Sequence, residues 1–276
     1  MQKLFSRKNH VIATRFPIIS AIIWIFIGIY VPTTLAATIM EPFYDSYHDV
    51  ARIFLFLLVI IISMVSLILF DKWFSPEYES ALTGKGLAYG FALSVPVIVF
   101  MIAYRVFKIA MGYEIYESFD LDSLLMGSRA GFGEEIFFRG IAVALLLRRF
   151  KDEKNIWFPP VFTGIFFGLT HLTNVSALAD FANVWLWLNT VFASVFGIIF
   201  GVIFTLSGNI WPCIILHTLY DALTFSVSLT DDSPDILPMI EIGVYFVFAL
   251  VYLYLMMKNR QKASLLWNEK WQLPKQ

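Results

Sequence analysis

The segment GFGEEIFFRG, residues 131–140, places three ionisable side chains in an otherwise apolar stretch. Glu135 and Arg139 are four residues apart, so on a helix they share one face and can form an ion pair. Glu134 lies about 100° away around the same helix, which leaves its carboxylate free for another partner. A free carboxylate can take a proton from water, so the spacing predicts a candidate general base beside a self-neutralising pair.

Two histidines occupy other apolar stretches, each with a companion four residues away. His171 follows Phe167, whose ring can brace the imidazole, and His217 precedes Asp221. Asp221 can hold His217 in one tautomer or join it in binding a common ligand. Two imidazoles with carboxylates can stabilise an oxyanion directly or bind a catalytic zinc ion, and the residues leave both mechanisms open.

The composition sets the environment in which this chemistry would occur. Of the 276 residues, 59% are hydrophobic and 15% are charged, and the mean hydropathy is +0.73, whereas soluble domains have about 25% charged residues. The net charge of −1 offers no basic surface for nucleic acid. A single cysteine, Cys213, excludes an intramolecular disulfide and a multi-cysteine zinc site. These features predict a polytopic membrane protein whose partner is the lipid bilayer.

The apolar runs predict the helices that position these side chains. A helix needs roughly 20 residues to cross the ~30 Å hydrocarbon layer. We expect an all-α membrane helix bundle of about eight transmembrane helices, forming a single membrane domain over residues 1–276 with a catalytic core at about 124–229. The expected helices cover residues 18–40, 50–70, 86–106, 124–147, 157–175, 181–206, 210–229 and 237–257.

The basic residues predict the orientation of this bundle, because cytoplasmic loops carry an excess of Lys and Arg. With both termini in the cytoplasm, only Arg52, Arg105 and Lys108 fall outside the cell. Trp267 and Trp271, after the last expected span, are predicted to be interfacial anchors. A cleaved signal peptide is disfavoured because the first apolar stretch is too long for one. We therefore expect an integral membrane protein, suited to a bacterial inner membrane, with cytoplasmic termini.

Ionisable residues inside such helices indicate function, because a charge near the bilayer centre costs ~2.5–3.5 kcal/mol. Counted along their helices, Glu134, His171 and His217 are expected at interior depths of the bilayer. The sequence contains no HExxH, which is the motif of helical zinc peptidases, and no GxSG or GxGD motif. Polar placements in three separate helices favour hydrolysis of a peptide bond within the membrane.

Three short motifs resemble those of a known family. The segments E134-E135-I-F-F-R139, F167-G-L-T-H171 and H217-T-L-Y-D221 are similar to the EExxxR, FxxxH and HxxxN/D motifs of the CPBP family. This family comprises the CAAX-protease and bacteriocin-processing membrane peptidases, also called the Abi family. The motifs occur in order in separate expected helices, within about residues 124–225.

The resemblance implies a role for each motif residue. Glu134 would be the water-activating base, Glu135 and Arg139 would shape the site, and the remaining three residues would bind a metal or form the oxyanion pocket. If a metal is bound, zinc is the expected ion. Its expected ligands are then Glu134, His171, His217 and Asp221; a metal-free mechanism stays open. Asp221 stands where prenyl-protein relatives usually have asparagine, which favours cation binding.

We therefore expect an intramembrane endopeptidase, a glutamate- or metal-dependent hydrolase that cuts a membrane-associated protein or peptide. CAAX-type cleavage and leader-peptide, bacteriocin or signal-peptide processing all fit this chemistry. The alternative is a non-catalytic membrane scaffold or immunity protein that uses the same polar cluster for rigidity. A proton-coupled transporter is disfavoured because the sequence lacks repeated halves.

Overall fold

The computed structural model describes residues 13, 15–43, 48–75, 77–111, 121–173, 184–226 and 236–272. Within these ranges the chain is helical, and its only extended pairing is an isolated bridge between Tyr78 and Trp271. The predicted all-α architecture is confirmed. The helices are α2 (Pro17–Met40), η2 (Glu41–Phe43), α3 (His48–Phe74), α4 (Leu87–Ala110), α5 (Leu121–Glu135), η3 (Ile136–Val143), α6 (Ala144–Arg149), α7 (Phe158–Thr170), η4 (His171–Thr173), α9 (Val184–Ser207), α10 (Trp211–Ser226), α11 (Ile236–Lys258) and α12 (Arg260–Lys270).

Five helical segments of the described chain are long and apolar enough to cross a membrane. They are Pro17–Phe43, Val50–Phe74, Leu87–Ala110, Leu186–Ser207 and Ile236–Lys258. The helix Phe158–Thr170 is apolar but shorter. The chain is thus a membrane helix bundle, while the count of eight crossings and the cytoplasmic position of the termini stay predictions.

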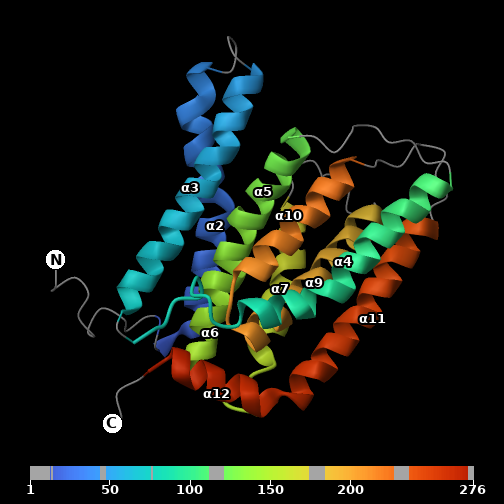
Figure 1. Ribbon diagram of the computed structural model, residues 1–276. Coiled ribbons are helices and arrows are strands. Elements are labelled where there is room, and N and C mark those ends of the chain that lie inside the picture. The colour runs from blue at the N-terminus through green and yellow to red at the C-terminus, as the bar shows by residue number, and fades with distance from the viewer. Residues whose placement is uncertain are drawn as a thin grey trace.

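Helix α9 forms the centre of the bundle. Of its most apolar window 78% is buried, against 22–33% in the other four long apolar helices, because α9 packs against α7 and α11 and also contacts α4 and α10. Figure 1 shows it behind α4 and α11. Three of its rings, those of Phe196, Phe200 and Phe204, are buried in the core. The site described below is built against this helix.

Glycines allow α7 and α9 to approach each other closely. A Cβ atom added to Gly164 would lie 2.6 Å from the backbone nitrogen of Ile198, and one added to Gly197 would lie 2.9 Å from the Cα of Gly164. These separations are shorter than any normal carbon contact. The crossing of α7 and α9 therefore requires glycine at both positions.

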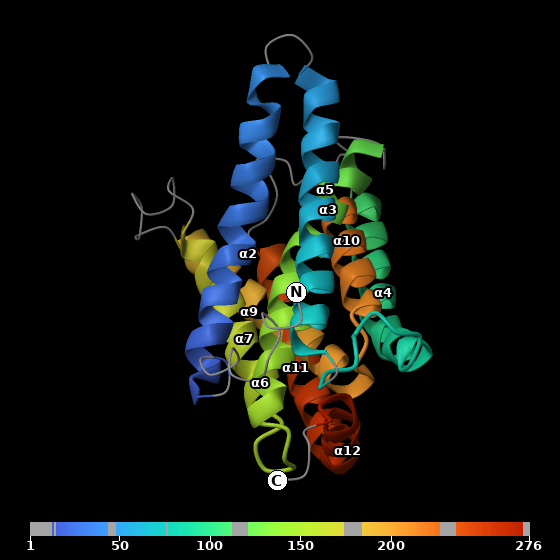
Figure 2. The ribbon, with the colours of Figure 1, turned by 90° about the vertical axis from the view of Figure 1, so that its left-hand side faces the viewer.

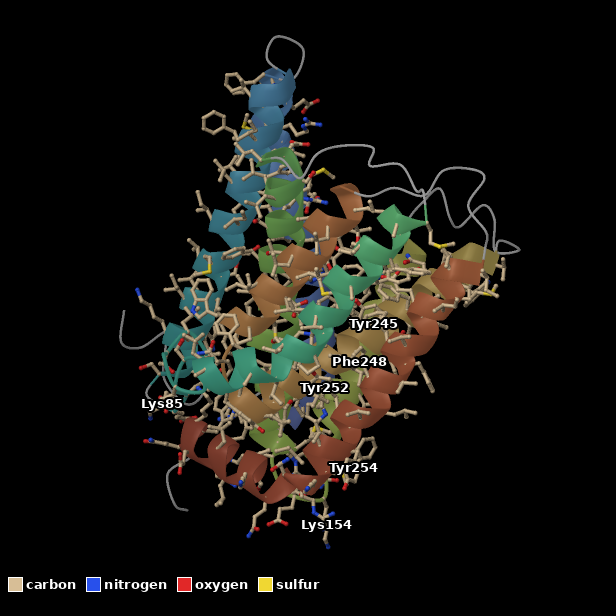
Figure 3. The ribbon with its side chains drawn as sticks, turned by 45° about the vertical axis from the view of Figure 1, so that its right-hand side comes forward. Lys85, Lys154, Tyr245, Phe248, Tyr252 and Tyr254 are labelled. Atoms are coloured by element: carbon tan, nitrogen blue, oxygen red, sulfur yellow. The ribbon has the colours of Figure 1, made fainter. Side chains whose placement is uncertain are left out.

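The two ends of the bundle differ in shape. At one end the hairpin of α2 and α3 extends beyond the other helices, and at the opposite end α12 lies across the base (Figures 1 and 2). The start of α2 lies at the α12 end. Lys85 and Lys154 also lie there (Figure 3), in agreement with the prediction that they share one side with the termini.

Helix α12 corrects the prediction that Trp267 and Trp271 are interfacial anchors. Both indoles are fully buried. The Nε1–H of Trp267 donates to the carbonyl of Thr205 at 2.8 Å, and that of Trp271 donates to the carbonyl of Ala144 at 2.9 Å. The chain turns back after Lys258, so these residues fasten the C-terminal helix to the base of α9 and α6 instead of facing lipid.

Helix α4 is longer than predicted and continues to Ala110. Arg105, which lies inside the expected span, and Lys108, which lies beyond its expected end, are therefore both part of a helix that is apolar enough to span the membrane. Both side chains are buried, with 6% and 4% of their surface exposed. The expected span ended at residue 106, four residues before the observed end of the helix.

Candidate active site

The EExxxR motif spans the point where an α-helix continues as a π-helix. Helix α5 ends at Glu135, and η3 continues directly as a π-helix in which the backbone N–H of Ala144 donates to the carbonyl of Arg139. Such i→i+5 segments are rare and often occur at functional sites. Every residue of η3 is buried. The sequence predicted one uninterrupted helix here, since hydrophobic periodicity does not separate a π-turn from an α-turn.

Glu135 and Arg139 form the ion pair that their spacing predicted. The Arg139 Nη1–H donates to Glu135 Oε1 at 2.9 Å, and both side chains are completely buried. The second guanidinium nitrogen, Nη2, donates to the carbonyl of Gly197 on α9 at 2.9 Å. The rings of Phe167 and Phe200 lie 4.9 and 5.4 Å from the guanidinium carbon. The pair therefore joins η3 to α9 in an apolar surrounding.

His217 on α10 completes this network. Its Nδ1 lies 2.8 Å from Glu135 Oε1, the same oxygen that accepts from Arg139. Because a carboxylate paired with a guanidinium only accepts, Nδ1 carries the hydrogen of this bond. Asp221 Oδ2 lies 3.7 Å from His217 Nε2, beyond hydrogen-bond distance, so of the two roles predicted for Asp221 the binding of a common ligand stays a prediction. Glu135 sets the tautomer.

Glu134 is the free carboxylate of the site. Its side chain is 39% exposed, while that of Glu135 is 0% exposed. The Glu134 Oε2 lies 3.8 Å from His217 Nε2. The two adjacent glutamates thus face different surroundings, as the helical rotation predicted. Glu134 and Asp221 therefore lie 3.8 and 3.7 Å from the imidazole nitrogen that Glu135 leaves unbonded.

The FxxxH motif brings the second histidine to the same region. His171 begins η4, directly after α7. Its Nδ1–H donates to the carbonyl of Phe167 at 2.9 Å, and the two rings are 5.0 Å apart, so the predicted bracing is confirmed. The ring of Phe167 also lies 6.0 Å from that of His217. Asp221 interacts electrostatically with His171, His217 and Glu134.

The donor atoms of the site are of the types that bind zinc. Their arrangement in the described residues, however, is not that of a metal site. In both histidines Nδ1 is held by an acceptor, so Nε2 is the nitrogen left for a ligand, as in metal sites. However, within the residues that the structure describes, no group of three His, Cys, Asp or Glu side chains is placed to hold one ion. Binding of zinc by Glu134, His171, His217 and Asp221 stays a prediction, and no step below depends on it.

Two contributors were not identified from the sequence as parts of the site. Gly197 supplies the carbonyl that accepts from Arg139, and Phe200 packs its ring 5.6 Å from that of His217. Gly197 and Gly201 form a GxxxG spacing, a sequence signal for close helix packing and not for a site residue. Cys213 is buried and donates its thiol to the Phe200 carbonyl.

The three motifs therefore meet in one place, with Glu134, His217 and Asp221 around a common space and Phe167 between the two imidazoles. Searches of curated proteins and of solved structures found no significant match to the chain. Residues 116–223 match the family model described as Type II CAAX prenyl endopeptidase Rce1-like. This match covers all three motifs and confirms the resemblance drawn from them: the segment 116–223 is similar to the Rce1-like CAAX endopeptidases.

Proposed function

We propose that this protein is an intramembrane endopeptidase in which Glu134 activates the water that attacks a peptide bond. The observation that carries the proposal is the different treatment of two adjacent glutamates. Glu135 is buried and neutralised by Arg139, while Glu134 is partly exposed and faces the free nitrogen of His217. Glu135 therefore has a structural role, and Glu134 is the carboxylate that can act as the general base.

Each of the motif side chains described next has a role in this mechanism. Glu134 takes a proton from a water held between its carboxylate and the substrate carbonyl, and returns that proton to the departing amine. His217, held through Nδ1 by Glu135, directs Nε2 toward the same space, and its protonated form donates Nε2–H to the developing oxyanion. Arg139 donates to the same carboxylate oxygen of Glu135 that holds His217, and therefore helps to keep the His217 ring in place.

The family model indicates the kind of substrate. A CAAX motif is a C-terminal sequence whose cysteine carries a prenyl chain, and the prenyl group would anchor the scissile bond at the membrane. We propose that the chain releases the C-terminal tripeptide from such a membrane-attached protein or peptide. Leader-peptide or signal-peptide processing requires the same chemistry and differs only in the segment that enters the site.

The test compares Glu134→Gln with Glu153→Gln in vesicles that contain a prenylated CAAX peptide. Glu153 is about half exposed and lies in the connector before α7, so its variant serves as a matched control. We expect Glu134→Gln to lower kcat by roughly 10²- to 10⁴-fold, the usual contribution of a general base, and the control to be unaffected. Thermal unfolding in detergent establishes that both variants are folded. Unchanged turnover in Glu134→Gln would reject the mechanism and favour a scaffold.

The role of a metal is decided by a separate measurement. Elemental analysis of the active protein, with and without His217→Ala, tests whether zinc is present and whether this histidine holds it. Stoichiometric zinc that is lost in the variant would add metal ligation to the role of His217. An active preparation without stoichiometric metal would remove zinc from the mechanism.

A further inference from the structure

A second polar cluster lies outside the site, where α4, α10 and α11 meet. Arg105 of α4 donates from Nη2 to the hydroxyl of Thr224 on α10 at 2.6 Å, and the same nitrogen lies 3.8 Å from Glu241 Oε1 on α11. Lys108 lies one turn farther along α4. The catalytic mechanism uses none of these groups. A membrane helix rarely buries two cations without a functional reason, because each is expensive in hydrocarbon.

The cluster has one positive charge more than its described partners neutralise. Arg105 and Lys108 are both more than nine-tenths buried, and among the described residues Glu241 is the carboxylate paired with Arg105. The ammonium group of Lys108 has no hydrogen bond or ion pair with any residue in the described part of the chain, and its nitrogen lies 5.3 Å from the centre of the Tyr104 ring. Arg105 flanks that ring at 5.7 Å. One bound carboxylate would complete the charge balance.

The distance between this cluster and the active site predicts the length of the peptide segment that could reach from one to the other. Thr224 follows His217 by seven residues, so the two lie on the same face of α10, two helical turns apart. At 1.5 Å per residue this places the Arg105 guanidinium, which contacts Thr224, about 10 Å along α10 from the imidazole. An extended tripeptide also spans about 10 Å, at 3.3–3.6 Å per residue. A peptide cut beside His217 would therefore place its third residue after the cut at this cluster.

We propose that Lys108, with Arg105 beside it, binds the C-terminal carboxylate of the substrate and so sets the distance from the chain end to the scissile bond. This inference rests on the proposed function, because it takes the cut to occur next to His217. Arg105 is positioned by Thr224 and Glu241. Lys108 supplies the unpaired charge. The site would thus measure three residues from the end of its substrate and reject internal peptide bonds.

The test uses two prenylated peptides that differ only at the C terminus, one a free acid and the other a carboxamide. We expect the wild-type protein to cleave the acid with a kcat/KM roughly 10- to 100-fold higher, as the loss of one charge-assisted hydrogen bond would give. The variant Lys108→Met should lose most of this preference by slowing cleavage of the acid alone, while Lys108→Arg should retain it. Lys85→Met is the matched control, because Lys85 is exposed at the opposite end of the bundle (Figure 3).

The outcomes separate the subsite from the catalytic proposal. Equal cleavage of acid and amide by the wild type, or an unchanged acid preference in Lys108→Met, would overturn the carboxylate subsite and leave the peptidase intact. Equal slowing of both peptides in Lys108→Met would assign Lys108 a structural role and also overturn it. Failure to cleave either peptide would overturn the proposed function, and the subsite with it.

Discussion

The buried pair of Glu135 and Arg139 gives a quantitative test of how the site is held together. Removing one partner leaves an uncompensated charge in the core, which costs ~3–5 kcal/mol in the free energy of unfolding. Glu135→Gln should fall at the upper end, because the buried guanidinium of Arg139 then loses the negative charge that it pairs with. Arg139→Met should fall at the lower end, because Glu135 keeps the hydrogen bond from His217.

The double variant distinguishes a true pair from two independent contributions. With Gln and Met together no charge is buried, and the amide oxygen of the glutamine can still accept from His217. We expect the double variant to be more stable than the sum of the single costs predicts, by about 2–3 kcal/mol. The assay is reversible unfolding in mixed micelles, followed by tryptophan fluorescence. The exposed pair of Lys85 and Glu79 is the control, with an expected coupling of at most ~1 kcal/mol. Costs for the buried pair that add to within about 0.5 kcal/mol would refute the reasoning.

Two further predictions concern packing and are checked by thermal unfolding in detergent. Gly197→Ala should lose ~1–3 kcal/mol of stability because its Cβ would meet the backbone of α7, whereas Gly243→Ala on α11, where a Cβ meets nothing within 4 Å, should gain up to about 1 kcal/mol. Equal effects at both glycines would contradict the close helix crossing. Trp271→Phe should lose ~1–3 kcal/mol because it leaves the Ala144 carbonyl without its indole donor, while Trp157→Phe, at an exposed position, should change stability by less than about 0.5 kcal/mol. If the Trp271 variant were as stable as the Trp157 variant, the hydrogen bond from Trp271 to Ala144 would not contribute to holding the C-terminal segment in place.

The fold was predictable from the sequence to the extent that it depends on apolar periodicity. The first span was expected at residues 18–40 and is observed as Pro17–Met40, and the last was expected at 237–257 and is observed as Ile236–Lys258. The pairing of Glu135 with Arg139 also followed from helical spacing alone. These features are local, so the chain itself specifies them.

The missed features depend on contacts between distant segments. The hydrogen bond from His217 to Glu135 joins residues 82 positions apart, and nothing in the HxxxD motif distinguishes this partner from the nearer Asp221. The burial of Trp271 depends on the carbonyl of Ala144, which is 127 positions away. The polar helix α12 lacks the hydropathy by which membrane segments are recognised, and a π-helix has no sequence signature comparable to an apolar repeat.

The helices that carry the motif residues are not among the five long apolar segments found in the described chain. Glu134 and Glu135 lie at the end of α5, His171 follows the short helix α7, and His217 lies on α10. A segment that is short or of low hydropathy partitions poorly into lipid by itself and needs neighbours that shield its polar groups. During synthesis, the segments that carry the motif residues would therefore enter the bilayer together with their apolar neighbours. Since His217 and Asp221 lie on α10, which is made after α5, α7 and α9, the candidate site cannot form until the ribosome has passed residue 221.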